Sequence, residues 1–434
     1  MTTTDEKAAF PDYPDYPRNA TALAMDNALF STGISFISTT TVLLAFLATL
    51  TSNEVLIGAA SGLLGSAWLL PQLLVAGLAT RQRRMKPMVL KAAWSTRPVL
   101  LPLALVVWLC SAKHPTLVFA VTVLAVFAFF VGDAFASVPW FSMLARVLPP
   151  QRRGRVMGLS SVLGGLGGIA AGMVVRYILG NPERFAYPGN YALLIVLGLA
   201  FILMSGVALI CVREPDQPST SETPPSFGQV LRSMPALLAR DRGFRRLVIT
   251  KLVLGFTGVA SSFYVLYATR ELGFQTAVTG YFVTAQVVGS VGSGLLLGYV
   301  QDKWGPLRHM RILMVLAAIP PVLAILAGLL QIQLPQAVLP LYLALYFFYG
   351  VAWTNVGWPF FNWILEYAPD KERPIYIGLT NTLGALTMFA PAIGGVLVRT
   401  VSYPAAFAVS IGFAVLSLAI SLGLPSPRTR NQTP

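Results

Sequence analysis

Two ionisable residues, Arg97 and Asp133, lie deep inside long apolar stretches of the chain. Charges are costly in an apolar medium, so those that persist there mark ion pairs, ligand sites or proton carriers. At about 1.5 Å per helical residue, the two positions differ in depth by only about 5 Å on adjacent antiparallel helices. We therefore predict that Arg97 and Asp133 meet. Two interpretations stay open: a structural buried pair, or a site for coupling or substrate binding in which Asp133 would carry a proton.

Four other ionisable residues are expected nearer the ends of the apolar stretches. Asp26 and Lys251 should lie within a turn or two of helix ends, which favours an interfacial or gating role for them. The only two histidines, His114 and His309, are expected in loops. The sequence therefore predicts no proton relay through buried imidazoles.

A polar ladder marks the first apolar stretch. Asn27, Ser31, Ser35 and Ser38 recur at three- or four-residue spacing, which places them on one face of a helix. Such a face should avoid lipid and could line a water-filled cavity.

An aromatic stripe runs along a later apolar stretch, and another stretch adds Tyr264. The members of the stripe are three or four residues apart and share one helical face: Tyr342, Tyr346, Tyr349 and Trp353. Most such stripes are packing surfaces. Set against a polar ladder, however, this one favours an amphipathic or aromatic ligand over a small inorganic ion.

Several kinds of chemistry have no support in the sequence. There is no phosphate-binding glycine loop followed by Lys, no nucleophilic triad and no cluster with metal-ligand spacing. Cys110 and Cys211 stand singly in apolar runs, so neither a disulfide nor a metal site is predicted. We expect no enzyme activity and no cofactor, and any work that the chain performs must draw on a gradient.

The composition decides which environment positions these residues. The 434 residues are 55% hydrophobic and only 11% charged, whereas soluble domains carry roughly a quarter of charged residues. About twenty apolar residues cross a bilayer, and such stretches recur along the whole chain. They predict twelve membrane-spanning helices, near 24–49, 55–79, 89–111, 117–145, 156–179, 191–212, 246–269, 277–300, 311–331, 339–365, 376–399 and 405–424.

The distribution of basic residues predicts the orientation of these helices. Of the 31 Lys and Arg residues, 25 fall in or beside the tails, the linker and the even-numbered loops. Five fall on the opposite side, and Arg97 lies in mid-span. Because cytoplasmic loops are rich in Lys and Arg, both tails and the linker are predicted to be cytoplasmic. The net charge of +14 is thus explained by topology, and nucleic acid is not an expected partner.

An internal repeat divides the chain into halves. The segments that begin at Pro139 and Pro359 match without a gap, at an offset of 220 residues: Phe141/Phe361, Pro149/Pro369, Arg153/Arg373, Gly158/Gly378 and Gly164/Gly384 are among the coincident pairs. An even number of spans per copy gives a parallel repeat, with its axis along the membrane normal. Five regions are predicted: a tail over 1–23, a six-helix bundle over 24–212, a linker over 213–245, a second six-helix bundle over 246–424 and a tail over 425–434.

One loop carries a recognisable motif. The text GYVQDKWGPLR resembles the loop signature of the major facilitator superfamily through Gly298, Asp302, Lys303 and Gly305, with Arg308 slightly displaced. The resemblance implies an all-α membrane protein of twelve transmembrane helices in two six-helix bundles. It also implies a gating role for this loop, which would meet the start of the fifth helix at residues 155–158.

The corresponding loop of the first half departs from the family pattern. Arg81 stands at the acidic position and Arg84 at the second glycine. This copy therefore lacks the acidic residue with which the family forms a lock here, and Glu366 or Asp370 could pair with the cluster around Arg81 instead.

Closely spaced glycines occur in the second, fifth, eighth and eleventh predicted helices. In the first three of these helices they are four residues apart, a spacing that allows close helix packing. They are Gly58 and Gly62, then Gly164, Gly168 and Gly172, then Gly294 and Gly298, then Gly394 and Gly395 at neighbouring positions. The resemblance implies that these helices form the moving seam between the halves, whereas the residues alone fit static packing equally well.

The resulting functional hypothesis is secondary active transport of a small organic solute by alternating access, in a multi-pass protein of the cell membrane that acts as a monomer. Proton-coupled efflux of amphipathic compounds is favoured by the aromatic stripe. Uptake of a polar nutrient is the alternative, because the fifth helix lacks the Gly-Pro pair of many drug antiporters. A third possibility is a sensor or lipid-handling protein that does not transport.

Overall fold

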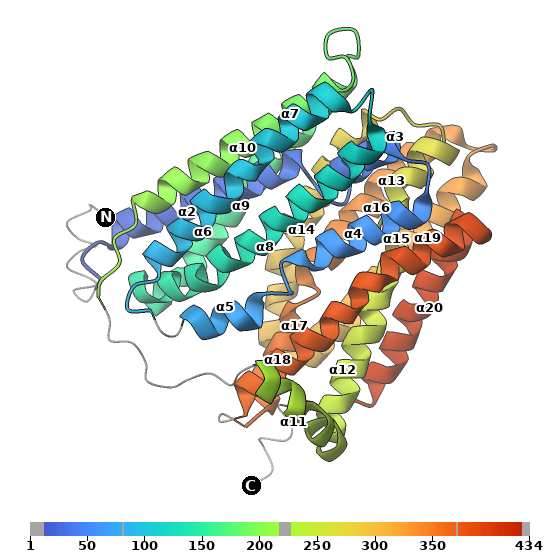
Figure 1. The fold of residues 1–434 in the computed structure, drawn as a ribbon. Coiled ribbons are helices and arrows are strands. Elements are labelled where there is room, and N and C mark those ends of the chain that lie inside the picture. The colour runs from blue at the N-terminus through green and yellow to red at the C-terminus, as the bar shows by residue number, and fades with distance from the viewer. Residues whose placement is uncertain (1–12, 80–81, 217–226, 370–371, 428–434) are drawn as a thin grey trace. The chain divides into compact units, whose positions relative to one another are not determined.

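A computed structural model describes residues 13–79, 82–216, 227–369 and 372–427 (Figure 1). Ten helices in this part of the chain are long and apolar enough to cross a membrane. They follow the last ten predicted spans to within about five residues: Lys86–Cys110, Pro115–Val147, Arg152–Leu179, Gly189–Ile210, Arg242–Glu271, Val278–Trp304, Pro306–Leu330, Pro335–Tyr367, Ile375–Thr400 and Tyr403–Leu422.

The first two predicted spans differ from the expectation, because each is divided into two shorter helices. α2 (Tyr16–Phe36) and α3 (Val42–Leu50) replace the first span. A run of Ser and Thr separates them, and such side chains compete for the backbone hydrogen bonds of a helix. α4 (Glu54–Ala67) and α5 (Gln72–Ala79) replace the second, and Pro71 at the break has no backbone N–H to donate.

Proline and glycine also interrupt three of the longer spans. Arg97 and Pro98 begin a 3₁₀ turn, η1 (Arg97–Val99), between α6 (Lys86–Thr96) and α7 (Leu100–Cys110). The span after the linker consists of α12 (Arg242–Gly255), η2 (Phe256–Val259), α13 (Phe263–Leu266) and η3 (Tyr267–Glu271). The eleventh consists of α18 (Arg373–Gly384), η4 (Ala385–Phe389) and α19 (Ala390–Thr400).

The remaining helices include a fourth divided span, in which Val356 and Gly357 separate α16 (Pro335–Asn355) from α17 (Trp358–Tyr367), and six continuous helices. The continuous helices are α8 (Pro115–Val147), α9 (Pro150–Leu179), α10 (Gly189–Ile210), α14 (Val278–Trp304), α15 (Pro306–Leu330) and α20 (Tyr403–Leu422). α11 (Phe227–Arg240) lies within the range predicted as a polar linker. The predicted N-terminal tail likewise ends in helix, because α2 begins at Tyr16.

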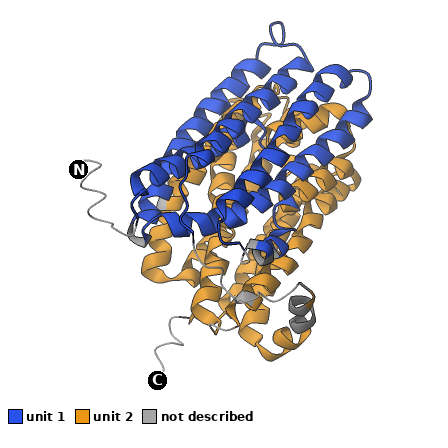
Figure 2. Ribbon diagram, turned by 60° about the vertical axis from the view of Figure 1, so that its left-hand side comes forward, with its two compact units in different colours: residues 1–38, 67–224 blue, residues 39–66, 225–434 orange. Residues whose placement is uncertain are grey.

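The chain forms two compact units (Figure 2). The first comprises residues 1–38 and 67–224, and the second comprises residues 39–66 and 225–434. In the first unit α2 packs on α9 and α10, and α6 packs on α8. In the second unit α16 packs between α14 and α15, α15 also contacts α20, and α3 contacts α13 and α14.

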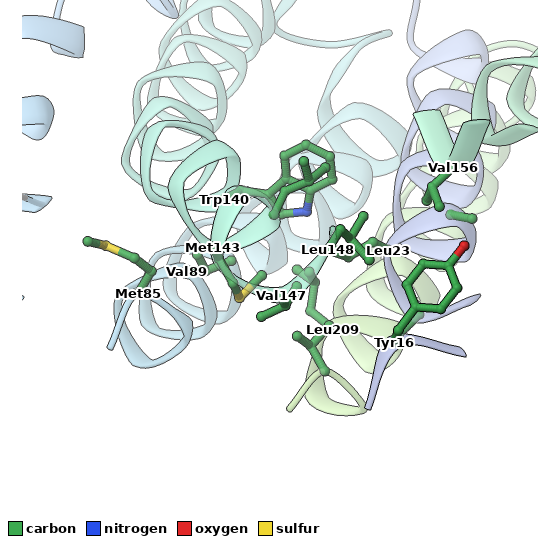
Figure 3. Packing of buried hydrophobic residues seen from close by; sticks show 14 residues of the cluster. Tyr16, Leu23, Met85, Val89, Trp140, Met143, Val147, Leu148, Val156 and Leu209 are labelled. Carbon is green, nitrogen blue, oxygen red and sulfur yellow. The ribbon is translucent and has the colours of Figure 1, made fainter. Parts of the chain in front are cut away.

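One end of the first unit is closed by an apolar cluster (Figure 3). Its buried side chains come from α2, α6, α8, α9 and α10 and include Leu23, Val89, Trp140, Met143 and Leu209. Burial of each large apolar side chain stabilises the packed helices by roughly 1.5–3 kcal/mol. The cluster fixes the relative positions of the helices that carry the polar residues described below.

At the same end, Glu214 connects the start of the linker to the start of α6 through hydrogen bonds. Its carboxylate accepts hydrogen bonds from the backbone N–H groups of Met85 (2.8 Å) and Lys86 (2.7 Å). It also pairs with Arg146, although at 3.3 Å, and the Glu214 side chain is only 1% exposed. The first N–H groups of a helix have no intrahelical partner, so this carboxylate acts as a distant N-cap for α6.

Glu214→Gln is expected to lower the free energy of unfolding by about 1–3 kcal/mol, because the amide cannot replace the charge-assisted bonds to Arg146 and the helix N-terminus. Thermal unfolding in detergent measures this. Asp216→Asn is the matched control. Its carboxyl pairs with Arg84 at 2.5 Å in solvent, and that hydrogen bond lowers its pKa. The stabilisation would be lost only as the pH falls through that lowered pKa, and exposed pairs contribute little. Equal melting temperatures for the two variants would contradict the capping role of Glu214.

Candidate functional site

A buried polar network occupies the interior of the first unit. Asp26 on α2 accepts a hydrogen bond from the Ser205 hydroxyl of α10 at 2.6 Å. Arg97 in η1 donates from one terminal nitrogen to the Ser205 hydroxyl (3.1 Å) and to the Ile202 carbonyl (2.9 Å). Asp26 and Arg97 are each only 5% exposed. The network thus links three helices through a carboxylate, a hydroxyl and a guanidinium.

Trp140 connects this network to the apolar cluster described above. Its indole N–H donates to the second oxygen of Asp26 at 2.7 Å, while its ring packs among the side chains shown in Figure 3. Both oxygens of Asp26 are therefore held by donors from different helices. These two hydrogen bonds fix the position of the Asp26 carboxylate, which interacts electrostatically with Arg97.

Asp133 on α8 is the second carboxylate near Arg97, and the two residues interact electrostatically. The predicted ion pair is not formed: none of the ion pairs within 4.0 Å in the described residues joins Arg97 and Asp133. Asp133 makes no hydrogen bond to any residue that the structure describes, and it is only half-buried. Arg97 instead donates its hydrogen bonds to α10, and its buried Nε has no hydrogen-bond partner among the described residues.

Two glycines make room for this arrangement. A Cβ atom at Gly132 would collide with Thr96, so Gly132 lets α8 approach α6 immediately beside Arg97 and Asp133. A Cβ at Gly206 would lie 3.1 Å from a terminal nitrogen of Arg97. A side chain at Gly132 would push Thr96 away, and one at Gly206 would press on the Arg97 guanidinium.

The prediction that Asp26 lies within a turn or two of a helix end was wrong. Because α2 begins at Tyr16, Asp26 is ten residues into the helix, or about 15 Å from its start. Lys251 is likewise nine residues into α12, which begins at Arg242. Sequence reasoning also missed Ser205 and Trp140, although a hydroxyl in the middle of an apolar stretch was an available signal.

The polar ladder of α2 faces α9 in part. The Asn27 amide donates to the Ser160 hydroxyl at 2.8 Å. A Cβ at Gly164 would lie 3.0 Å from the Cβ of Ser31, and the Ser35 hydroxyl bonds to the Ser31 carbonyl of its own helix at 3.0 Å. These polar groups therefore help α2 and α9 pack closely.

The aromatic stripe belongs to a larger cluster in the second unit. The ring of Tyr346 stacks on Phe282 of α14 with centroids 4.3 Å apart. Tyr264 contacts Tyr349 edge-on at 5.8 Å and stacks on Phe407 of α20 at 5.4 Å. The cluster thus draws on α13, α14, α16 and α20.

Members of the stripe differ in their surroundings. Tyr342 and Tyr346 are buried, and their hydroxyls have no hydrogen-bond partner among the described residues. Buried polar groups are normally paired, so these two hydroxyls have a hydrogen-bonding capacity that the described residues leave unused. Trp353 stacks on Tyr349 at 6.0 Å but is 49% exposed, so it lies at the end of the packed stripe.

The predicted gating loop forms the junction of α14 and α15. Asp302 and Lys303 are in the last turn of α14, and Gly305 has φ 84°, a conformation that favours glycine. Lys303 and Arg308 both lie over the ring of Trp304, at 5.1 Å and 5.3 Å from its centroid. The contact with residues 155–158 that the resemblance implies stays a prediction.

The proposed pairing of Arg81 with Asp370 involves residues that lie outside the described part of the chain, and its Glu366 variant stays a prediction. The prediction that His309 lies in a loop was wrong. It is buried within α15, and its Nδ1 lies 2.9 Å from the side-chain oxygen of Gln301. His114 does precede a helix, α8.

Residues 39–66 make close contacts within the second unit. A Cβ at Gly58 or Gly62 of α4 would collide with the backbone carbonyls of Pro391 and Met388, respectively. At the start of α4, Glu54 pairs with Arg270 at 2.9 Å. Arg270 also donates to the carbonyl of Thr51 (3.0 Å), just beyond the end of α3. This end of α4 is therefore held by both charge and close packing.

The family model described as Major Facilitator Superfamily matches residues 28–390. The chain belongs to the major facilitator superfamily. It is accordingly a multi-pass membrane protein of a transporter family, and no enzyme function is indicated. No curated protein matches the sequence.

Solved structures of this superfamily share the fold at low sequence identity. A D-xylose–proton symporter matches with a TM-score of 0.68 at 15% identity, over 95% of this chain and 98% of that one. The nucleoside transporter NupG matches with a TM-score of 0.68 at 14% identity, over 93% and 99%. A bacterial homologue of the iron transporter ferroportin, in an inward-facing state, gives 0.67 at 12% identity, over 94% and 98%.

Proposed function

We propose that this superfamily member is a secondary active transporter that moves a small organic solute by alternating access, coupled to protons. The observation that carries the proposal is the group of one guanidinium and two carboxylates inside the first unit. Arg97 interacts electrostatically with both Asp26 and Asp133, but only Asp26 is held by hydrogen bonds. Asp133 is the carboxylate that can gain or lose a proton without breaking a hydrogen bond to the described residues.

The aromatic cluster supports an amphipathic solute and, with it, efflux. Its rings form an apolar environment, and the Tyr342 and Tyr346 hydroxyls provide hydrogen-bonding groups that the described residues leave unused. Ligand sites commonly combine an apolar lining with a few polar groups that orient the ligand. Uptake of a polar nutrient is the alternative direction.

Flux measurements in proteoliposomes test the proposal. The purified full chain is reconstituted with a pH-sensitive dye inside, and amphipathic and polar compounds are added one at a time. Efflux coupled to protons predicts that an imposed pH gradient drives accumulation of an amphipathic compound and that the compound, in turn, moves protons. Equal rates with and without the gradient would contradict coupling. Transport of polar compounds alone would favour nutrient uptake.

A further inference from the structure

Lys251 is a cation inside a membrane-spanning helix with no carboxylate partner among the described residues. It lies nine residues from the start of α12, about 13 Å along the helix. Within the described residues its ammonium donates one hydrogen bond, to the side-chain oxygen of Asn381 on α18, at 3.3 Å. None of the ion pairs in the part of the chain that the structure describes includes Lys251.

Nearby acidic groups at this end of α12 are engaged elsewhere. Asp241 accepts hydrogen bonds from the Phe244 N–H and from the hydroxyls of Tyr367 and Tyr376, at 2.8–2.9 Å. Glu372 pairs with Arg240 at 2.5 Å. An unpaired charge inside a membrane span is costly and is a functional-site candidate by default.

The pair formed by Lys251 and Asn381 is rich in donors. An ammonium has three N–H donors, and only one is used here. The Asn381 amide directs its oxygen toward Lys251, and its NH₂ group, with two more donors, has no hydrogen-bond partner among the described residues. The site therefore has four N–H donors that the described residues leave unused, and its one acceptor atom already accepts a hydrogen bond from Lys251. Such a set complements an oxyanion.

The surroundings leave space for a ligand atom. Lys251 and Asn381 are both half-buried. Gly384, one turn beyond Asn381 on α18, has no side chain, and a Cβ placed there would come to 3.8 Å from the Lys251 ammonium. Lys251 is thus partly removed from water, in an environment where a charge-assisted hydrogen bond is stronger than in bulk solvent.

We propose that Lys251 and Asn381 form an anion-binding site that recognises the carboxylate, or a similar oxyanion group, of an amphipathic organic solute. This inference rests on the proposed transport function and narrows its substrate class to organic anions. Lys251 would supply the charge, and Asn381 would orient the ammonium through its oxygen while its NH₂ group donates to the ligand.

Equilibrium binding to the full-length protein in detergent tests the site separately from transport. The probes are two matched pairs, 4-phenylbutyrate with 4-phenylbutyramide and benzenesulfonate with benzenesulfonamide. We expect the anion of each pair to raise the melting temperature more than its neutral partner, since a ligand that binds the folded state stabilises it. Lys251→Gln should weaken anion binding roughly 10- to 100-fold, the usual effect of losing a charge-assisted hydrogen bond. Lys251→Arg should retain most of it.

Asn381→Asp separates recognition from packing. This nearly isosteric change places a carboxylate at the atom that now accepts from Lys251, so an internal ion pair should form and exclude the anion. Binding should fall as far as in Lys251→Gln, while the melting temperature without ligand stays the same or rises. Lys91→Gln, which removes an exposed lysine of α6, is the matched control and should bind like the parent protein.

Several outcomes would contradict the proposed anion-binding site. They are equal binding of anions and neutral partners, retention of anion binding by Lys251→Gln or Asn381→Asp, or failure of both anions to bind. Flux in proteoliposomes is then a separate question. If anion binding depends on Lys251 but no flux occurs, the anion-binding site is supported and the proposed transport function is contradicted. If neutral compounds are transported but anions do not bind, the transport function is supported and the anion-binding site is contradicted.

Discussion

Asp133→Asn is expected to reduce proton movement coupled to solute flux to the leak rate of protein-free liposomes, with solute binding retained. The reason is that Asp133 is the half-buried carboxylate beside Arg97 that makes no hydrogen bond to the described residues. An amide of the same shape removes the titrating proton without removing a structural bond. The dye-based proteoliposome assay measures the coupled flux, and thermal shift with the transported compound measures binding.

The contrasting variant is Asp26→Asn. Both oxygens of Asp26 accept hydrogen bonds, from Trp140 at 2.7 Å and from Ser205 at 2.6 Å. An amide can accept at only one of these positions, so this variant should lose about 1–3 kcal/mol of stability. Full gradient-driven transport by the Asp133→Asn variant would show that Asp133 is not the proton carrier. Equal destabilisation by the two substitutions would show that Asp133 has a structural role instead.

Most of the helical architecture could be predicted because it depends on apolar runs that are long enough to cross a bilayer. The exceptions have local causes. The first two spans break at a Ser/Thr run and before Pro71, where side-chain competition or a missing N–H outweighs the hydropathy of the whole stretch. α11 lies in a polar range because an amphipathic helix needs only one apolar face.

The candidate site was harder to predict, since hydropathy does not locate the start of a helix. The first span was placed from residue 24, where the apolar run begins, whereas α2 begins eight residues earlier at Tyr16. That difference moved Asp26 from an expected helix end to the interior. The same error affected Lys251, because α12 starts at Arg242.

Hydrogen-bond partners posed a different difficulty. Depth along two helices predicted that Arg97 and Asp133 meet, but the choice of partner depends on the helix rotation and on a third helix. Ser205 and the Ile202 carbonyl of α10 provide acceptors to Arg97 at 3.1 Å and 2.9 Å. A single sequence gives no information on the angle at which α10 faces η1, so this part of the network required the structure.

Gly62→Ala is expected to destabilise the second unit by about 1–3 kcal/mol, the usual cost of forcing extra volume into a close contact. A Cβ at this position would collide with the Met388 carbonyl of η4, and a backbone carbonyl cannot move aside as a flexible side chain can. Gly65→Ala is the matched control on the same helix. Nothing lies within 4 Å of its Cβ position, so it should be neutral or slightly stabilising, because alanine favours a helix. Thermal unfolding in detergent compares the two.

The same substitution should also change the access of solvent to the start of α4. This end is held in place by the Glu54–Arg270 ion pair (2.9 Å) and by close packing at Gly395, where a Cβ would lie only 2.7 Å from the Val55 Cα. If the α4 contact closes one side of the transport path, separating it at Gly62 must shift the population toward the form that is open on that side. Cys110 and Cys211 are replaced by Ser, and Val55→Cys is labelled with a membrane-impermeant maleimide from the side opposite the basic loops. Labelling should be faster with Gly62→Ala than with Gly65→Ala, and equal rates would identify the glycine contact as static packing.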